Sequence, residues 1–222
     1  YKADTKNYRV KKTVHVEADF DRRFPVQETE WLAKLNAEHD FPAAIVAYAA
    51  LEDPEVEDVL VRHREAGGSL VKGIRQILCW HETPSYQFVP RNDLMRDPAW
   101  RAGFAKLAKH GMSFDLMVYP QQLGDAADLA AAFPDTTIIM DHGAMPVDRS
   151  AEGLAAWRVG LTALAQHKNV SMKISGLGQT DWEWTDASMR PMIRDLVEIF
   201  GPDNAMFASN FPVDKTYSSF DR

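Results

Sequence analysis

Two stretches of sequence decide the fold, Ile138-Ile139-Met140-Asp141-His142-Gly143 and Met206-Phe207-Ala208-Ser209-Asn210-Phe211-Pro212-Val213-Asp214. Each is a short apolar run that stops in polar residues and is followed by a glycine or a proline. Buried parallel strands read as continuous apolar runs, and ligands bind beyond the carboxyl ends of such strands. The two stretches therefore predict a parallel sheet and the edge at which its functional residues lie.

Short apolar runs and amphipathic stretches alternate along the rest of the chain. The pattern predicts seven strands, over residues 12–16, 43–47, 71–77, 114–118, 137–140, 170–174 and 205–208. It also predicts six helices between them, over residues 26–38, 54–66, 98–110, 125–133, 152–167 and 187–200. Strict alternation of this kind indicates a parallel sheet with crossover helices.

The fold class that follows is α/β, and the seven units fit a (β/α)8 TIM barrel that is one unit short. The chain has 222 residues, whereas the barrel typically takes about 250 residues. No linker divides it, so we expect a single domain over residues 1–222. A doubly wound open sheet is the alternative, but no glycine-rich dinucleotide or phosphate loop follows any strand.

Composition narrows the classes of function. The net charge is −7 and no basic stripe is present, so we expect no nucleic-acid partner. No apolar run reaches the roughly 18 residues of a membrane span, and no membrane partner is expected. The only cysteine, Cys79, excludes an internal disulfide and is typical of a cytoplasmic protein. These properties favour a small-molecule substrate and leave a homo-oligomer open.

Polar and aromatic residues concentrate where the predicted strands end, whereas the connections from helix to strand are ordinary turns. Such enrichment at one edge is typical of the active face of a barrel. Glu17 follows the first strand and is either a substrate acceptor or acid–base group, or half of a buried pair with His15 that holds the rim. Trp182 and Trp184 either form a stacking wall for a substrate ring or cap a loop.

Two cations lie on strands of this sheet, and either can bind a substrate carboxylate. Lys173 stands between Met172 and Ile174 in a core-like run, where it can also steady an oxyanion. Arg75 offers a planar fork that matches a carboxylate. The structural alternative for both is a long side chain that reaches the rim only to keep its charge in water.

His142 is the strongest single candidate for chemistry. It closes an apolar strand between Asp141 and Gly143, and a histidine in that place can act as base, acid or metal ligand. The alternative is a core histidine hydrogen-bonded to the backbone.

Six different strand-end motifs follow one another along the chain: Val14-His15-Val16-Glu17-Ala18, Lys72-Gly73-Ile74-Arg75-Gln76, Phe114-Asp115-Leu116, Asp141-His142-Gly143, Lys173-Ile174-Ser175-Gly176-Leu177 and Ala208-Ser209-Asn210-Phe211-Pro212-Val213-Asp214. Together they resemble the amidohydrolase-related family, and more narrowly its branch of sugar-lactone hydrolases and pyrone-dicarboxylate lactonases. The resemblance covers residues 13–215. It implies a metal-dependent-hydrolase type of TIM barrel that opens a lactone by attack of water on the ring ester.

The resemblance also implies roles for individual residues. His142 matches the histidine after the sixth strand of the family and would handle the proton. Glu17 and Lys173 match polar catalytic positions at strand ends, and Asn210 matches the eighth-strand site where many relatives carry an aspartate. The substrate-binding positions implied or suggested by the motifs are Arg75, Trp182, Trp184, His15 and Asp214.

The chain departs from the family pattern at two places. A His-x-His pair marks the first strand of the family and is absent here. We therefore expect a barrel fragment without the first strand and the final helix, with a zinc ion only in the full-length protein and His142 as its candidate ligand. Asn210 cannot accept a proton, so Glu17 or Asp214 would have to supply the carboxylate.

Two other functions stay open on the same scaffold. The first is a decarboxylase or hydro-lyase, because related barrels carry out carbon–carbon chemistry. The second is a non-catalytic ligand-binding barrel in which Asn210 marks a lost base.

Overall fold

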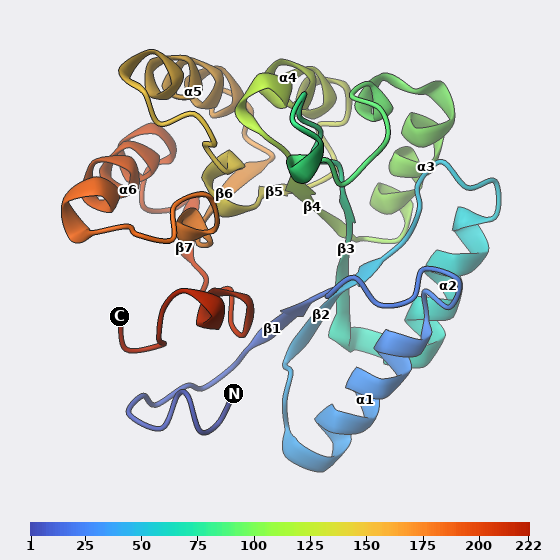
Figure 1. Cartoon of the computed structure of the whole chain (residues 1–222). Helices are drawn as coiled ribbons and strands as arrows, with labels where there is room; N and C mark the ends of the chain where they lie inside the picture. The colour runs from blue at the N-terminus through green and yellow to red at the C-terminus, as the bar shows by residue number, and fades with distance from the viewer.

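Seven parallel strands lie side by side in the order in which they occur in the chain. The computed structural model describes all residues 1–222. The strands are β1 (Val14–Val16), β2 (Ala44–Tyr48), β3 (Val71–Ile77), β4 (Ser113–Met117), β5 (Ile138–Met140), β6 (Val170–Ile174) and β7 (Ala205–Phe207). This sequential order is that of a β/α barrel, and the sheet curls without closing (Figure 1). The predicted α/β barrel fold is confirmed.

Six α-helices follow the strands and cover one face of the sheet (Figure 1). They are α1 (Gln27–His39), α2 (Val56–Gly67), α3 (Pro98–Lys109), α4 (Leu123–Ala132), α5 (Ala151–Leu164) and α6 (Asp186–Phe200). All predicted helices are present, with ends that differ by a few residues. No helix is both long and apolar enough to span a bilayer.

The main hydrophobic core fills the space between the sheet and these helices. Trp100 and Phe104 of α3 are fully buried and pack with Phe114 of β4. A smaller apolar cluster, which contains Ile77 and Met117, lies separately. Because strand side chains alternate between faces, residues next to Phe114 point away from the helices. That opposite face carries the charged residues described below.

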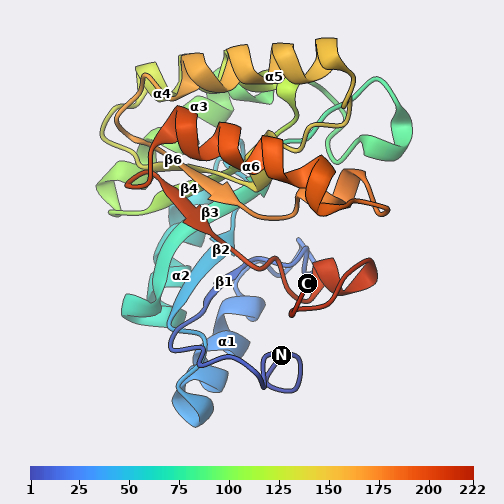
Figure 2. The same ribbon diagram turned by 90° about the vertical axis from the view of Figure 1, so that its left-hand side faces the viewer.

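The two outer strands, β1 and β7, leave the sheet open between them. Val14 of β1 is 60% exposed and Phe207 of β7 is 80% exposed. The terminal segments meet on this open side instead of a further strand (Figure 2). The Lys215 ammonium lies 2.7 Å from an Asp4 carboxylate oxygen, and the rings of Tyr8 and Phe220 pack edge to face.

The contact of α3 with the loop after β2 yields a test of the packing. A Cβ atom on Gly103 would overlap the backbone carbonyl of Leu51, whereas a Cβ on Gly124 of α4 would meet nothing within 4 Å. We expect Gly103→Ala to destabilise the protein by about 1–3 kcal/mol, because a backbone clash cannot be relieved by a rotamer change. Gly124→Ala should instead stabilise it by about 0.5 kcal/mol. Urea unfolding of both variants checks this, and equal midpoints would contradict the packing.

Candidate active site

Five charged side chains, three from strands and two from just beyond strand ends, form one buried network on the face of the sheet away from the helices. Arg75 on β3 donates from Nε to Glu17 Oε1 at 2.8 Å, and its Nη1 lies 3.4 Å from Asp141 Oδ2. Lys173 on β6 lies 2.8 Å from Asp141 Oδ1 and also donates to Asp115 of β4. The chain of contacts thus runs from the end of β1 to β6.

This network contains three carboxylates and two cations. The pKa values of two of the carboxylates, Asp115 and Asp141, are shifted in opposite directions. Burial raises the pKa of Asp115 to about 6, helped by the negative charge of Asp141 and opposed by Lys173. Burial opposes ionisation of Asp141 as well, but Lys173, His142 and Arg75 together hold its pKa below the ordinary value. Asp141 is therefore the fixed anion, and Asp115 takes up a proton more readily.

His142 lies directly after Asp141 and is itself buried. Its Nδ1 is 2.8 Å from Ser175 Oγ. Burial lowers the pKa of His142 to about 4, and the positive charges of Arg75 and Lys173 act in the same direction. The imidazole is therefore neutral at physiological pH and able to accept a proton. Its Nε2 has no hydrogen-bond partner in the chain and is accessible to solvent.

The backbone that holds His142 is bent by an unusual run of left-handed residues. His142, Gly143, Ala144 and Met145 have φ values of 55°, 60°, 57° and 42°. Trp157 Nε1 of α5 donates to the Gly143 carbonyl at 2.6 Å and holds the turn from behind. Non-glycine residues in this region are strained, and such strain is concentrated at functional sites.

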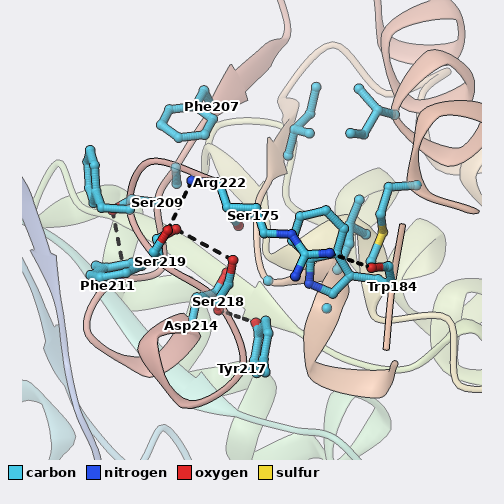
Figure 3. A pocket seen from close by; sticks show the side chains of 18 of the residues that line it. Ser175, Trp184, Phe207, Ser209, Phe211, Asp214, Tyr217, Ser218, Ser219 and Arg222 are labelled. Atoms are coloured by element: carbon cyan, nitrogen blue, oxygen red, sulfur yellow. Dashed lines mark hydrogen bonds between the residues drawn. The ribbon is translucent and has the colours of Figure 1, made fainter. Parts of the chain in front are cut away.

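A pocket of about 580 Å³ opens beside His142. It lies among the ends of β6 and β7, α6 and the C-terminal segment, and Ser175 belongs to its lining (Figure 3). Trp184 forms another part of the wall, with the Arg222 guanidinium 4.2 Å from its ring centroid. Ser175 thus contacts His142 and borders the pocket at the same time.

Beyond the end of β7, two side chains hydrogen-bond to a carboxylate at the wall of this pocket. Asn210, with φ of 51°, donates from Nδ2 to Asp214 Oδ1 at 2.5 Å, and the Tyr217 hydroxyl donates to the same oxygen. Burial raises the pKa of Asp214, and the two donors oppose that rise. Asn210 therefore orients a carboxylate that lines the pocket.

The structure brings together four of the predicted site residues, whereas two others, His15 and Trp182, lie apart from them. Glu17, Arg75, Lys173 and His142 all belong to the network or adjoin it. By contrast, His15 bonds to Glu28 Oε1 of α1 at 2.9 Å and is not part of the network.

Two further candidates, Asp214 and Trp184, line the pocket beside the network, and Asn210 hydrogen-bonds to Asp214. Trp182 is 66% exposed and stacks on Tyr217, with 6.3 Å between ring centroids. It does not line the pocket.

Sequence reasoning assigned no role to Asp115, Asp141 or Ser175, although all three stood in the motifs. For Asp115 a signal was available, because a lone carboxylate between Phe114 and Leu116 in a buried strand requires a cation as partner. Nothing in the sequence indicates that Ser175 contacts His142, since 33 residues separate them.

The buried imidazole predicts a pH dependence of stability. Because His142 has a folded pKa of about 4 against an ordinary 6.5, the unfolded chain binds more protons in that window. Stability is therefore lost as the pH falls from 6.5 to 4, by about 3 kcal/mol from this group. We expect His142→Asn, which tolerates the left-handed backbone and retains an acceptor for Ser175, to flatten the curve in that window. Urea unfolding at stepped pH measures it. The exposed His39→Asn variant is the control, and a curve unchanged in His142→Asn would contradict the burial argument.

Two curated proteins resemble the chain over nearly its whole length. An uncharacterized protein, y4mH, of Sinorhizobium fredii is 42% identical over 99% of this chain and 73% of its own length. An L-fucono-1,5-lactonase of Burkholderia ambifaria is 28% identical over 95% of this chain and 68% of its own length. The chain thus spans about 70% of these relatives.

Among solved structures, an amidohydrolase of Burkholderia multivorans with bound zinc has a TM-score of 0.84 to this chain. It is 25% identical, and the match covers 99% of this chain and 75% of that one. In the present chain no three His, Cys, Asp or Glu side chains come together as a metal site. Asp115, Asp141 and Glu17 contact Lys173 and Arg75 instead. These residues do not by themselves fit a zinc ion.

The family assignment agrees with the fold and with these relatives. The family model described as Amidohydrolase matches residues 1–221. A match over this length leaves almost no part of the sheet or of the candidate site outside it. The chain belongs to the amidohydrolase family.

Proposed function

We propose that the protein is a hydrolase that adds water across the ring ester of a lactone. The observation that supports this most is the neutral, buried imidazole of His142, at the carboxyl end of β5 and next to a fixed carboxylate. Ester hydrolysis needs a group that takes a proton from the attacking oxygen and returns it to the leaving oxygen. A neutral histidine whose ring is held by a hydrogen bond suits both steps.

The charged network supplies what the histidine needs once it has taken up the proton. Asp141 is adjacent to His142, and its negative charge favours the protonated imidazole. Lys173 and Arg75 keep Asp141 ionised and in place. Asp141 would stabilise the imidazolium through its charge, as the buried carboxylate does in hydrolases that use a histidine as base.

The kind of lactone is suggested by a relative. The Burkholderia ambifaria relative is named an L-fucono-1,5-lactonase. The pocket beside His142 offers both polar and aromatic groups, including Asp214 and Trp184, which suit a hydroxylated ring. We therefore propose a sugar lactone as the substrate class, and L-fucono-1,5-lactone as the first compound to assay.

Lactone opening by the product of the complete gene tests the proposal. Ring opening releases an acid, which a pH-stat titration follows directly. We expect His142→Ala to lower kcat/KM by about 10²–10⁴, the usual contribution of a general base. The exposed His39→Ala variant controls for the loss of a histidine elsewhere and should keep full activity.

Unchanged turnover by His142→Ala would remove the histidine from the mechanism. Absence of acid release from a panel of sugar lactones, together with CO2 release from carboxylated aromatic compounds, would replace the proposal by a decarboxylase.

A further inference from the structure

The long connection between β3 and α3, residues 78–97, is fastened to the segment that follows β4 (Figure 1). Gln122 Oε1 accepts a hydrogen bond from the Trp80 backbone N–H at 3.1 Å, and Gln122 Nε2 donates to the Leu78 carbonyl at 2.8 Å. Gln121 Nε2 donates to the Trp80 carbonyl at 2.8 Å. The same Gln122 oxygen also accepts from the Tyr119 backbone N–H. These bonds hold the ends of the two connections in one fixed arrangement.

Three rings meet where these two connections touch, and we call His81, Tyr86 and Tyr119 the ring triad. His81 and Tyr86 belong to the connection after β3, and Tyr119 belongs to the segment after β4. Each pair of rings packs edge to face, with centroids between 5.4 and 6.3 Å apart. Edge-to-face packing is a preferred geometry for aromatic pairs. The triad is therefore a preformed aromatic wall.

The ring triad lies on the inner face of the sheet, just beyond the charged network. Met117 follows Asp115 by two residues on β4, so both side chains are on the same face. Met117 and Tyr119 belong to the small apolar cluster, and Tyr86 packs against it. The apolar cluster thus joins the triad to the charged residues of the candidate site.

His142 lies between the ring triad and the pocket. In the order of the strands, β5 stands between β3 and β4, whose ends carry the triad, and β6 and β7, whose ends border the pocket. Met145 packs in the same apolar cluster as Tyr119, and its backbone N–H donates to the His142 carbonyl at 3.0 Å. A ligand bound over His142 would therefore have the pocket on one side and the triad on the other.

The polar ends of the ring triad have no hydrogen-bond partners in the chain. His81 Nδ1 accepts from the Thr83 backbone N–H at 3.0 Å, which leaves the His81 Nε2–H as a free donor. The hydroxyls of Tyr86 and Tyr119 are accessible to solvent and unpaired, although Tyr119 as a whole is only 1% exposed. Burial raises the pKa of Tyr119, so its hydroxyl keeps its proton. A buried tyrosine usually finds a partner for its hydroxyl, and here a ligand can supply one.

From this geometry we propose that the ring triad is a binding subsite for the hydroxyl-bearing carbons of the substrate. The inference rests on the proposed lactone hydrolysis and adds the groups that select among lactones. A sugar presents C–H groups that pack on aromatic rings and hydroxyls that pair with polar groups at the ring edges. A site that hydrogen-bonds a substrate hydroxyl discriminates against an analogue without it, because its own polar groups are then left unpaired. The triad therefore favours polyhydroxylated lactones over plain ones.

Tyr119→Phe tests the subsite, because it removes one hydroxyl and keeps the ring. The complete protein is assayed with L-fucono-1,5-lactone as substrate and with δ-valerolactone, the same ring without hydroxyls, as competing ligand. We expect the KM for L-fucono-1,5-lactone to rise about 3–10-fold, the range for a neutral hydrogen bond, at unchanged kcat. The inhibition constant of δ-valerolactone should stay the same. Tyr8→Phe, which removes a hydroxyl from the 47% exposed Tyr8 of the N-terminal segment, is the control and should change neither value.

The thermal unfolding midpoint of Tyr119→Phe should equal that of the unaltered protein, and a lower midpoint would assign the hydroxyl to the fold instead. Equal losses of affinity for both lactones, or no loss for either, would overturn the inference and leave the lactonase intact. If the unaltered protein opens no lactone, the proposed function falls, and calorimetric titration with L-fuconate tests the triad by itself. Weaker binding of L-fuconate to Tyr119→Phe would keep the subsite, whereas equal binding or none would remove it.

Discussion

The contacts of Lys173 with Asp115 and Asp141 are the interaction on which the rest of the site depends. The sheet is open, so no ring of strands fixes the positions of the strand ends. The two ion pairs of Lys173 link β4, β5 and β6, and Arg75 extends the link through Asp141 to Glu17. Removing one partner of a buried ion pair typically costs about 3–5 kcal/mol, because the other charge is left without compensation. The network therefore constrains the strand ends as well as neutralising them.

His142 owes its properties to this arrangement. Asp141 is held by Lys173 and Arg75, so the residue that follows it leaves the strand at a defined point and turns into the left-handed run. The ring then lies against Gly176 and Ser175 at the end of the neighbouring strand. Burial and two nearby cations keep the ring neutral. A proton acceptor results from packing and charge together, and the pocket beside Ser175 gives a ligand access to it.

Much of the fold and part of the site could be predicted from the sequence. The period of apolar residues located all strands and helices, and a parallel sheet requires that strand ends meet at one edge. Glu17, Arg75 and Lys173 were predicted because polar groups at that edge stand out. What could not be predicted is the pairing: Asp115 contacts Lys173 across two strand spacings, a relation that only the curl of the sheet establishes.

His15 and Glu17 show the limit of alternation in short strands. They lie two residues apart, and a buried pair that holds the rim was one of the two predicted roles of Glu17. The strand ends at Val16, however, and beyond it the side chain of Glu17 is free to reach Arg75. His15, still within the strand, contacts Glu28 of the covering helix α1. Asn210 likewise lies beyond the end of its strand, β7. There it donates a hydrogen bond to Asp214 and does not join the charged network.

The most direct test of this account is the protonation of His142 itself, followed through its ring resonances by NMR while the pH is lowered. Packing against Ser175 and Gly176, with Arg75 and Lys173 nearby, predicts an imidazole that stays neutral until the pH approaches about 4. A midpoint at or above the ordinary 6.5 would show that the ring is not held in this buried, cation-flanked position, and would contradict the account.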